Sequence, residues 1–238
     1  MERLGKVISN SGYTSRRKAD ELISLGKVLV NGEKAILGQK VSGNDVITID
    51  GKVIKPSNGN YEYYLLNKPR GVVSTSIDEK GRKTIVDLID TKERIYPVGR
   101  LDYDTTGAII LTNDGELTNK LLHPSKEIDK VYLAKVKGII EVADINKLKK
   151  GLKIDDFITS PARVKLKSID KKTNTCLVSI TIHEGHNHQV KKMFEVLGYD
   201  VVRLTRLSFA GLDVKSLKSG EYRKLSVKEV QRLFSMTK

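Results

Sequence analysis

A polar turn near the middle of the chain carries the side chains best suited to chemistry. The stretch 99–115 predicts a strand, a tight turn at Asp102, a second, apolar strand and an Asn-Asp-Gly turn. A carboxylate at the edge of an apolar framework, beside Arg100, suits a catalytic acid, base or nucleophile. A plain turn explains Asp102 equally well, because Asp and Gly favour turns. We interpret Asp104 and Asp114 as turn formers.

A second polar group, His-Glu-Gly-His-Asn-His, spans residues 183–188. A zinc-protease helix needs His-Glu, two further residues and then His, and Asn187 occupies the place of that second His. Three imidazoles could still bind zinc, but no partner ligand is evident elsewhere. Because the chain is strongly basic, with 43 Lys and Arg against 29 Asp and Glu, we favour hydrogen bonds from these side chains to RNA. Lys191 and Lys192 follow at the start of a predicted helix, where a solvated helix face explains them as well.

Several other catalytic signatures are missing from the sequence. No Walker loop, Gly-x-Gly-x-x-Gly loop or nucleophile elbow occurs. These gaps argue against ATP, GTP and dinucleotides, and they leave carboxylates as the main candidates for chemistry.

The composition indicates a polyanionic partner. The 238 residues carry a formal charge of +14, with basic residues spread along the whole chain. Each Lys or Arg that neutralises a phosphate releases counterions and adds affinity for nucleic acid. No apolar run approaches the ~18 residues of a membrane span, and no signal peptide is evident, so we favour nucleic acid over a membrane. The single Cys176 suits a reducing cytoplasm.

The first 55 residues predict a small unit of two helices and a curled sheet. Apolar residues recur at helical spacing on either side of Gly12, and Ser15 is a candidate N-cap for the second helix. An Asn-Gly turn after Val30 joins two short strands. Several cations of this unit cluster near the start of the second helix, where backbone N–H groups also favour phosphate. The predicted RNA contacts are Arg3, Lys6, Arg16, Arg17, Lys18 and Lys27.

A linker over residues 56–60 separates this unit from a second domain over 61–238. The second domain predicts many strands with scattered helices, including a helix after Thr84, another before Gly198 and a capping box at Ser226. Strands and helices do not alternate regularly. We therefore expect an α+β fold with a largely antiparallel mixed sheet flanked by helices.

The N-terminal segment resembles an S4 RNA-binding domain, through Arg3-Leu4-Gly5-Lys6-Val7-Ile8, Thr14-Ser15-Arg16-Arg17-Lys18-Ala19 and Gly26-Lys27-Val28-Leu29-Val30-Asn31-Gly32. The rest of the chain resembles the RsuA/RluB family of ribosomal RNA pseudouridine synthases. The motifs that carry this resemblance are Leu66-Asn67-Lys68-Pro69-Arg70-Gly71, the run Gly99-Arg100-Leu101-Asp102 through Gly115, Lys130-Val131-Tyr132, and Glu184-Gly185-His186-Asn187-His188-Gln189-Val190-Lys191-Lys192-Met193. They fall in family order, and the first domain resembles the large-subunit branch.

The resemblance implies a role for individual residues. Asp102 matches the catalytic Asp, Tyr132 the active-site Tyr, and Lys191 the basic partner that keeps the Asp ionised. Arg100 matches the Arg that fills the space vacated by the target base. Within the same motifs we assign substrate contacts to Asn67, Gln189, Val190 and Lys192. The last motif has His and Lys where the family is richer in Arg, and Lys lacks the bidentate fork of Arg.

The resemblance implies a cytoplasmic enzyme that isomerises a flipped-out uridine of structured ribosomal RNA, with 23S RNA as the favoured target and a monomer as the default state. It implies no metal, cofactor or membrane. Three alternatives remain at this point: a 16S RNA target, a non-catalytic RNA-binding assembly factor, and an N-glycosidase that uses the same carboxylate.

Overall fold

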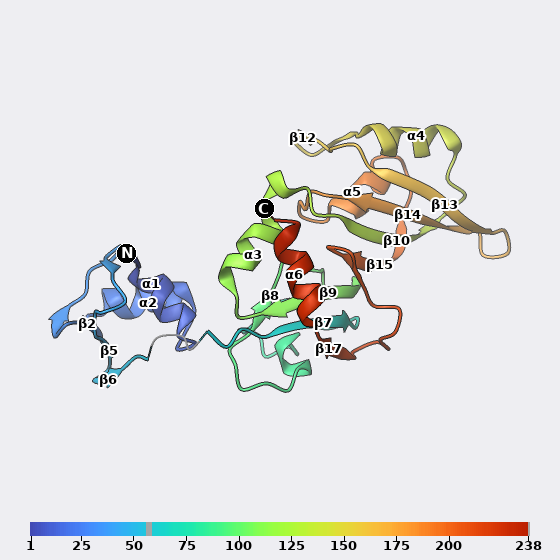
Figure 1. Cartoon of the computed structure of the whole chain (residues 1–238). Coiled ribbons are helices and arrows are strands. Elements are labelled where there is room, and N and C mark those ends of the chain that lie inside the picture. The colour runs from blue at the N-terminus through green and yellow to red at the C-terminus, as the bar shows by residue number, and fades with distance from the viewer. Residues whose placement is uncertain (56–58, 238) are drawn as a thin grey trace. The chain divides into compact units, whose positions relative to one another are not determined.

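The computed structural model describes residues 1–55 and 59–237, and the chain divides into two compact units (Figure 1). Unit 1 comprises Met1–Glu62 with Thr91–Arg94 and Asn113–Gly115. Unit 2 comprises Tyr63–Asp90, Ile95–Thr112 and Glu116–Lys238. Of the predicted linker over 56–60, residues 56–58 lie outside the described residues.

Unit 1 packs two helices, α1 (Leu4–Asn10) and α2 (Arg16–Ser24), with two small sheets. The Ser15 side chain accepts a hydrogen bond from the Lys18 amide, so it caps α2 as predicted. Asn31 and Gly32 both have positive φ, which an Asn-Gly turn between two strands requires. The strands are β1 (Glu2–Arg3), β2 (Val28–Val30), β3 (Glu33–Lys34), β4 (Lys40–Val41), β5 (Ile47–Ile49) and β6 (Lys52–Val53). β1 pairs with β4, and the other four form a sheet of order β3-β2-β5-β6.

Unit 2 contains a nine-stranded sheet with the order β13-β14-β10-β15-β9-β7-β17, to which β16 and β8 add at β15 and β9. Every pairing is antiparallel except that of β9 with β15. This parallel pair joins two antiparallel halves, so the prediction of a mixed, mostly antiparallel sheet is confirmed. The strands are β7 (Tyr63–Lys68), β8 (Tyr96–Pro97), β9 (Thr106–Thr112), β10 (Lys130–Lys137), β13 (Arg163–Asp170), β14 (Thr175–Ile182), β15 (Val201–Phe209), β16 (Leu212–Asp213) and β17 (Tyr222–Lys224), and β11 (Lys153–Ile154) pairs separately with β12 (Phe157–Ile158).

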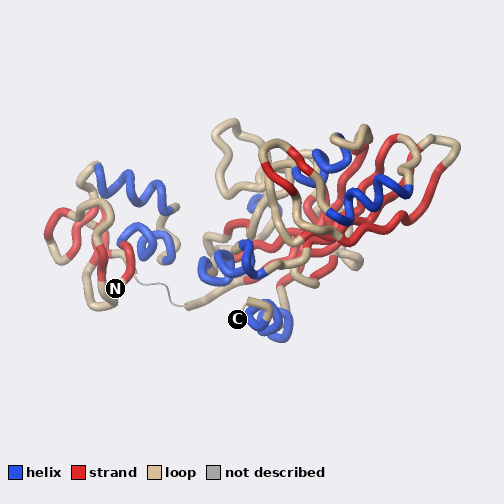
Figure 2. The backbone as a smooth tube through the Cα atoms, turned by 90° about the horizontal axis from the view of Figure 1, so that it is seen from above, coloured by secondary structure: helices blue, strands red, loops and turns tan. Residues whose placement is uncertain are grey.

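Helices lie at the outside of this sheet (Figure 2). Helices α4 (Val142–Lys150) and α5 (Gln189–Glu195) bury apolar residues against β10 and β14 in one core. Helices α3 (Gly115–Leu122) and α6 (Val227–Ser235) contribute to a second core with residues of β7 and β9. The capping box predicted at Ser226 is present at the start of α6. Two short 3₁₀ turns, η1 (Val86–Leu88) and η2 (Pro124–Lys126), complete the fold.

Of two local predictions for unit 2, one is wrong, and the other, a short helix from Thr84 through Ile89, is met only in part. Residues 99–101 do not form a strand, because β8 ends at Pro97 and the positive φ of Gly99 turns the chain away from the sheet. The residues after Thr84 form only the 3₁₀ turn η1, although the Asp87 amide does donate a hydrogen bond to the Thr84 hydroxyl. The consequence for the site is that Asp102 lies on an irregular loop between β8 and β9.

Candidate active site

Lys68 holds the backbone of the Asp102 loop in place. Its side chain is 0% exposed at the end of β7, and Nζ donates hydrogen bonds to the carbonyl oxygens of Asp102 at 3.0 Å and Thr105 at 2.9 Å. Burial lowers the pKa of Lys68 to about 8, and the charges of Asp102 and Asp104 oppose that shift. Sequence reasoning missed Lys68, although a Lys at the end of an apolar strand and before a Pro was a usable signal.

The Asp102 carboxylate faces an ammonium group and an imidazole of the opposite segment. Lys191 Nζ, on α5, lies 3.3 Å from Oδ2, and His188 Nε2 lies 3.3 Å from Oδ1. Thr105 Oγ1 lies 3.5 Å from Oδ2. The Asp102 side chain remains 29% exposed, so solvent and a ligand can both reach it. The structure thus brings together Asp102 and Lys191, which lie far apart in the sequence.

Lys191 is shared between two carboxylates. Its Nζ donates a shorter hydrogen bond, 2.7 Å, to Oδ1 of Asp104. Burial by itself would lower the pKa of Lys191, but the hydrogen bond to Asp104 and the charges of both carboxylates outweigh burial and raise it. The same hydrogen bond lowers the pKa of Asp104. Asp104 is therefore more than a turn former, because it helps to hold the cation beside Asp102.

The three histidines of the 183–188 segment face different surroundings. His188 has positive φ at the N-terminus of α5, which directs it to Asp102, while the His186 ring lies 3.9 Å from the ring of Phe157. The carbonyl oxygen of His183 accepts a hydrogen bond from Lys130. Among residues 1–55 and 59–237, no group of three or more His, Cys, Asp or Glu side chains is placed to hold a metal ion.

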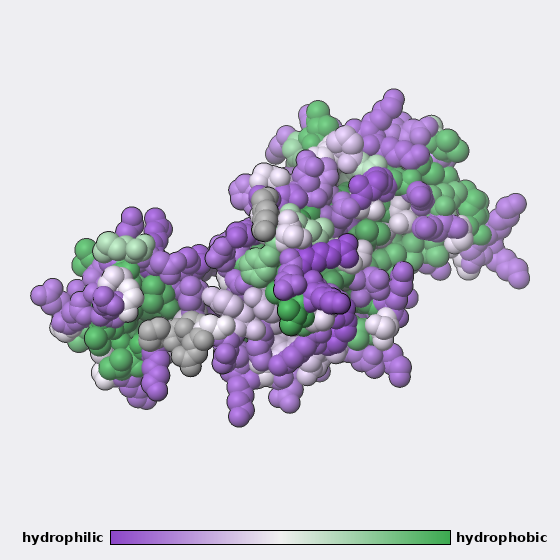
Figure 3. Space-filling view, viewed as in Figure 1, coloured by the Kyte–Doolittle hydropathy of each residue, from purple (hydrophilic) through white to green (hydrophobic). Residues whose placement is uncertain are grey.

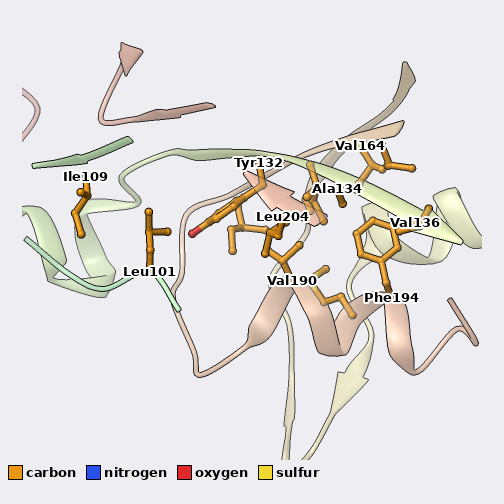
Figure 4. Close-up of a cluster of buried hydrophobic side chains, with 14 of the residues drawn as sticks. Leu101, Ile109, Tyr132, Ala134, Val136, Val164, Val190, Phe194 and Leu204 are labelled. Carbon is orange, nitrogen blue, oxygen red and sulfur yellow. The ribbon is translucent and has the colours of Figure 1, made fainter. Parts of the chain in front are cut away.

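Tyr132 forms an apolar wall beside Asp102. It lies on β10, is only 8% exposed, and packs in the core that includes Leu101, Val190 and Leu204. Figure 4 shows its ring beside Leu204, with the hydroxyl pointing toward Leu101. A small pocket opens here, and its lining includes Arg100, Asp102, Thr105, Tyr132, Ile182, His188, Gln189, Val190 and Leu204. A carboxylate with a paired cation thus borders a small pocket of mixed lining, in which Tyr132, Val190 and Leu204 supply the apolar part.

The remaining predicted substrate contacts divide into two groups. Arg100, Gln189 and Val190 line the pocket, although Gln189 is buried and its amide binds the His186 N–H and Glu184. Asn67 donates to the Leu217 carbonyl, and Lys192 forms an ion pair with Asp155. The structure does not bring these two side chains to the Asp102 carboxylate.

The predicted RNA contacts of unit 1 lie mostly at its surface. Arg3, Arg16 and Arg17 are exposed and form no ion pair with any described residue. Lys6, Lys18 and Lys27 pair with Glu2, Glu21 and Asp50 respectively. Unpaired arginines can bind phosphate without first breaking a protein ion pair. In the part of the chain that the structure describes, no helix is long and apolar enough to cross a membrane.

The two units match two protein families. Residues 62–196 match the family model of RNA pseudouridylate synthases, and residues 2–47 match that of the S4 domain. The first match covers more than half of the chain and contains Asp102, Tyr132 and Lys191. The chain belongs to the RNA pseudouridylate synthase family, as its motifs predicted.

Individual relatives extend over nearly the whole chain. The chain is 50% identical to ribosomal large subunit pseudouridine synthase B of Bacillus subtilis, and the match covers 98% of this chain and 96% of that protein. It is 37% identical to the dual-specificity RNA pseudouridine synthase RluF of Escherichia coli, with 98% of this chain and 79% of that protein covered. A crystal structure of a pseudouridylate synthase superposes with a TM-score of 0.70 at 32% identity and covers 98% of this chain and 100% of that one.

Proposed function

We propose that the protein converts a uridine of large-subunit ribosomal RNA to pseudouridine, with Asp102 as the catalytic carboxylate. The observation that carries the proposal is Asp102 itself, which contacts Lys191 and lines the same small pocket as Tyr132. The large-subunit target rests on the similarity to the Bacillus subtilis enzyme of that name.

The reaction breaks the C1′–N1 bond of the uridine, turns the uracil and joins C1′ to C5. Asp102 starts it either by attacking C1′ or by removing the C2′ proton, and the uracil leaves with the electron pair of the broken bond. Lys191 places a positive charge 3.3 Å from the Asp102 carboxylate in either step. After the new bond forms, C5 loses its proton and N1 gains one, so the product is an isomer. The Tyr132 ring is placed to stack on the uracil, and its hydroxyl to assist the C5 proton transfer.

The target base must leave its stack to reach Asp102, because the Tyr132 ring on which it would stack is only 8% exposed. Base flipping costs a few kcal/mol, which contacts to the surrounding RNA offset. Hydrophilic side chains dominate the visible face of both units (Figure 3), and the formal charge of +14 supplies the attraction to phosphate. Arg100 lines the pocket, where it can take the space that the base vacates.

The test is to incubate large-subunit and small-subunit rRNA transcripts with the protein and to map pseudouridine by reverse transcription. We expect one or a few modified uridines in the large-subunit RNA. Modification of the small-subunit RNA alone would refute the target. Binding without modification would show an assembly factor, and release of free uracil would show an N-glycosidase.

Replacing Lys191 with Met should lower kcat by at least about 30-fold and change KM less, because the cation stabilises charge at Asp102 during the reaction. The comparison variant is Asp104→Asn, whose amide oxygen can still accept the hydrogen bond that holds Lys191 beside Asp102, so kcat should change by less than about threefold. Steady-state kinetics on the mapped RNA measure both. If Lys191→Met raised KM and left kcat unchanged, Lys191 would bind RNA and would not assist Asp102.

The double change Arg16→Ala and Arg17→Ala should weaken RNA binding and make it less sensitive to salt. Each lost phosphate contact lowers the slope of log affinity against log salt by about 0.7 to 0.9, so we expect a decrease of about 1.5. Filter binding over a range of salt concentrations measures the slope. Exposed Lys34 and Lys52 of unit 1, changed together to Ala, provide the control, and an equal loss there would refute a specific role for α2.

A further inference from the structure

Two buried cations of unit 2, Arg206 and Lys130, lie beside Tyr132 without a role in the chemistry described so far. Arg206 is 2% exposed, and its Nε donates a 2.6 Å hydrogen bond to the Ala108 carbonyl. Its Nη2 is buried and has no hydrogen-bond partner among the described residues. Lys130 is also buried, and its Nζ donates to the carbonyl oxygens of Ile128 at 2.9 Å and His183 at 2.6 Å.

These two cations lie close to each other on neighbouring strands. Both approach the ring of Phe209, with Arg206 Cζ 4.9 Å and Lys130 Nζ 5.8 Å from its centroid. Burial, and then the charge of Arg206, lower the pKa of Lys130 to about 8. The aromatic face compensates each cation only in part, because a cation–π contact is worth less than a charge-assisted hydrogen bond to an anion.

Both side chains line a pocket next to the one that holds Asp102. Arg100, Tyr132 and His186 line both pockets, so the two hollows adjoin. Glu184 is the carboxylate of the second pocket, and it is already bound to the Ser160 backbone and hydroxyl and to Gln189. The second pocket is therefore lined by two cationic residues, and the guanidinium of one of them has a nitrogen without an acceptor.

We propose that Arg206 and Lys130 form a phosphodiester-binding subsite, which holds a backbone phosphate of the RNA strand next to the target uridine. A buried donor without an acceptor is costly, and a phosphate oxygen is the acceptor for which a guanidinium is best shaped. The phosphate would fix the strand while the uridine enters the Asp102 pocket. The RNA assignment rests on the proposed function, whereas anion binding does not.

The first experiment tests anion binding without RNA. The Nε–Hε NMR signal of Arg206 is identified by its absence from an Arg206→Met or Arg206→Lys variant. The wild-type protein is then titrated with inorganic phosphate, and with sodium chloride at equal ionic strength. We expect a saturable shift with phosphate only, which Lys130→Met weakens at least about fivefold. No saturable shift in the wild type would overturn the subsite, as would a shift that Lys130→Met leaves unchanged.

The second experiment tests RNA as the source of the phosphate. Single phosphates around the mapped uridine are replaced, one at a time, by methylphosphonates, which carry no charge. Each modified RNA is compared with a control RNA that has the same sugar at that position and a normal phosphate. We expect that the methylphosphonate at one position weakens RNA binding by the wild-type protein about tenfold. The same RNA should bind to Lys130→Met less than twofold more weakly than its control RNA does. Arg203→Met, an exposed change on the same strand β15, should behave as wild type.

The outcomes separate the two proposals. The RNA phosphate would be refuted if the wild-type protein bound every methylphosphonate RNA as tightly as its control RNA. It would also be refuted if the substitution weakened binding to Lys130→Met as much as to the wild type. Both conclusions hold even if inorganic phosphate binds. A protein that binds inorganic phosphate but forms no pseudouridine in any rRNA would refute the proposed function and leave the anion site standing. Thermal unfolding of each variant shows that its fold is intact.

Discussion

Asn in place of Asp102 should reduce pseudouridine formation by at least about 10³-fold, while RNA affinity changes by less than about threefold. The amide has nearly the shape of the carboxylate but can neither attack C1′ nor accept a C2′ proton. The loop should keep its conformation, because Lys68 binds the backbone carbonyl of residue 102 and not its side chain. Lys191 also keeps a partner, since Asp104 lies 2.7 Å away. The loss should therefore be chemical.

Single-turnover assays with excess enzyme measure the chemical step, and gel shifts on the same RNA measure affinity. Asp104→Asn is the matched control, because it makes the same chemical change two residues away on the same loop. If both variants lost the chemical step to a comparable extent, activity would depend on the total negative charge of the loop and not on Asp102 in particular. Modification at a near-normal rate by Asp102→Asn would exclude Asp102 as the catalytic group.

The sequence motifs identified residues that lie around Asp102, but they did not predict the local structure that positions those residues. Tyr132 and Lys191 were assigned to the site by resemblance alone, since no local pattern links β10, α5 and the loop before β9. The antiparallel sheet followed from strand-like segments without regular intervening helices. The predicted strand before Asp102 was wrong because local propensity does not detect a glycine that leaves the sheet at positive φ.

Buried cations were the second gap. Lys130 and Arg206 look in sequence like solvated charges, and composition assigned such residues, Lys68 among them, to a general basic surface. Their role depends on tertiary contacts, because each is buried by segments remote in the chain. The register of β10 against β15 pairs Arg206 with Tyr132 and Lys130 with Phe209, and so places both cations beside the site. The sequence of one strand alone does not reveal its register with a neighbour.

The site also depends on one glycine at the junction of the two sheet halves. Asp102 precedes β9 in one half, whereas Tyr132 lies in the other half, which meets β9 only through the short parallel pairing with β15. Gly107 pairs with Arg206 in that register and has a φ of +109°. A Cβ there would lie 2.1 Å from the Arg206 carbonyl oxygen, which is a backbone atom of the neighbouring strand.

Gly107→Ala should therefore lower the free energy of unfolding by about 3 kcal/mol or more, because the side chain combines an unfavourable φ with a backbone clash. Urea unfolding followed by circular dichroism measures the loss. The control is Gly220→Ala, which has a φ of +86° with no atom within 4 Å of the added Cβ and should cost about 1 kcal/mol. If both variants lose the same stability, the clash is relieved locally and the junction is not rigid. If Gly107→Ala is folded at the assay temperature and still loses activity, the pairing of β9 with β15 sets the distance between Asp102 and Tyr132.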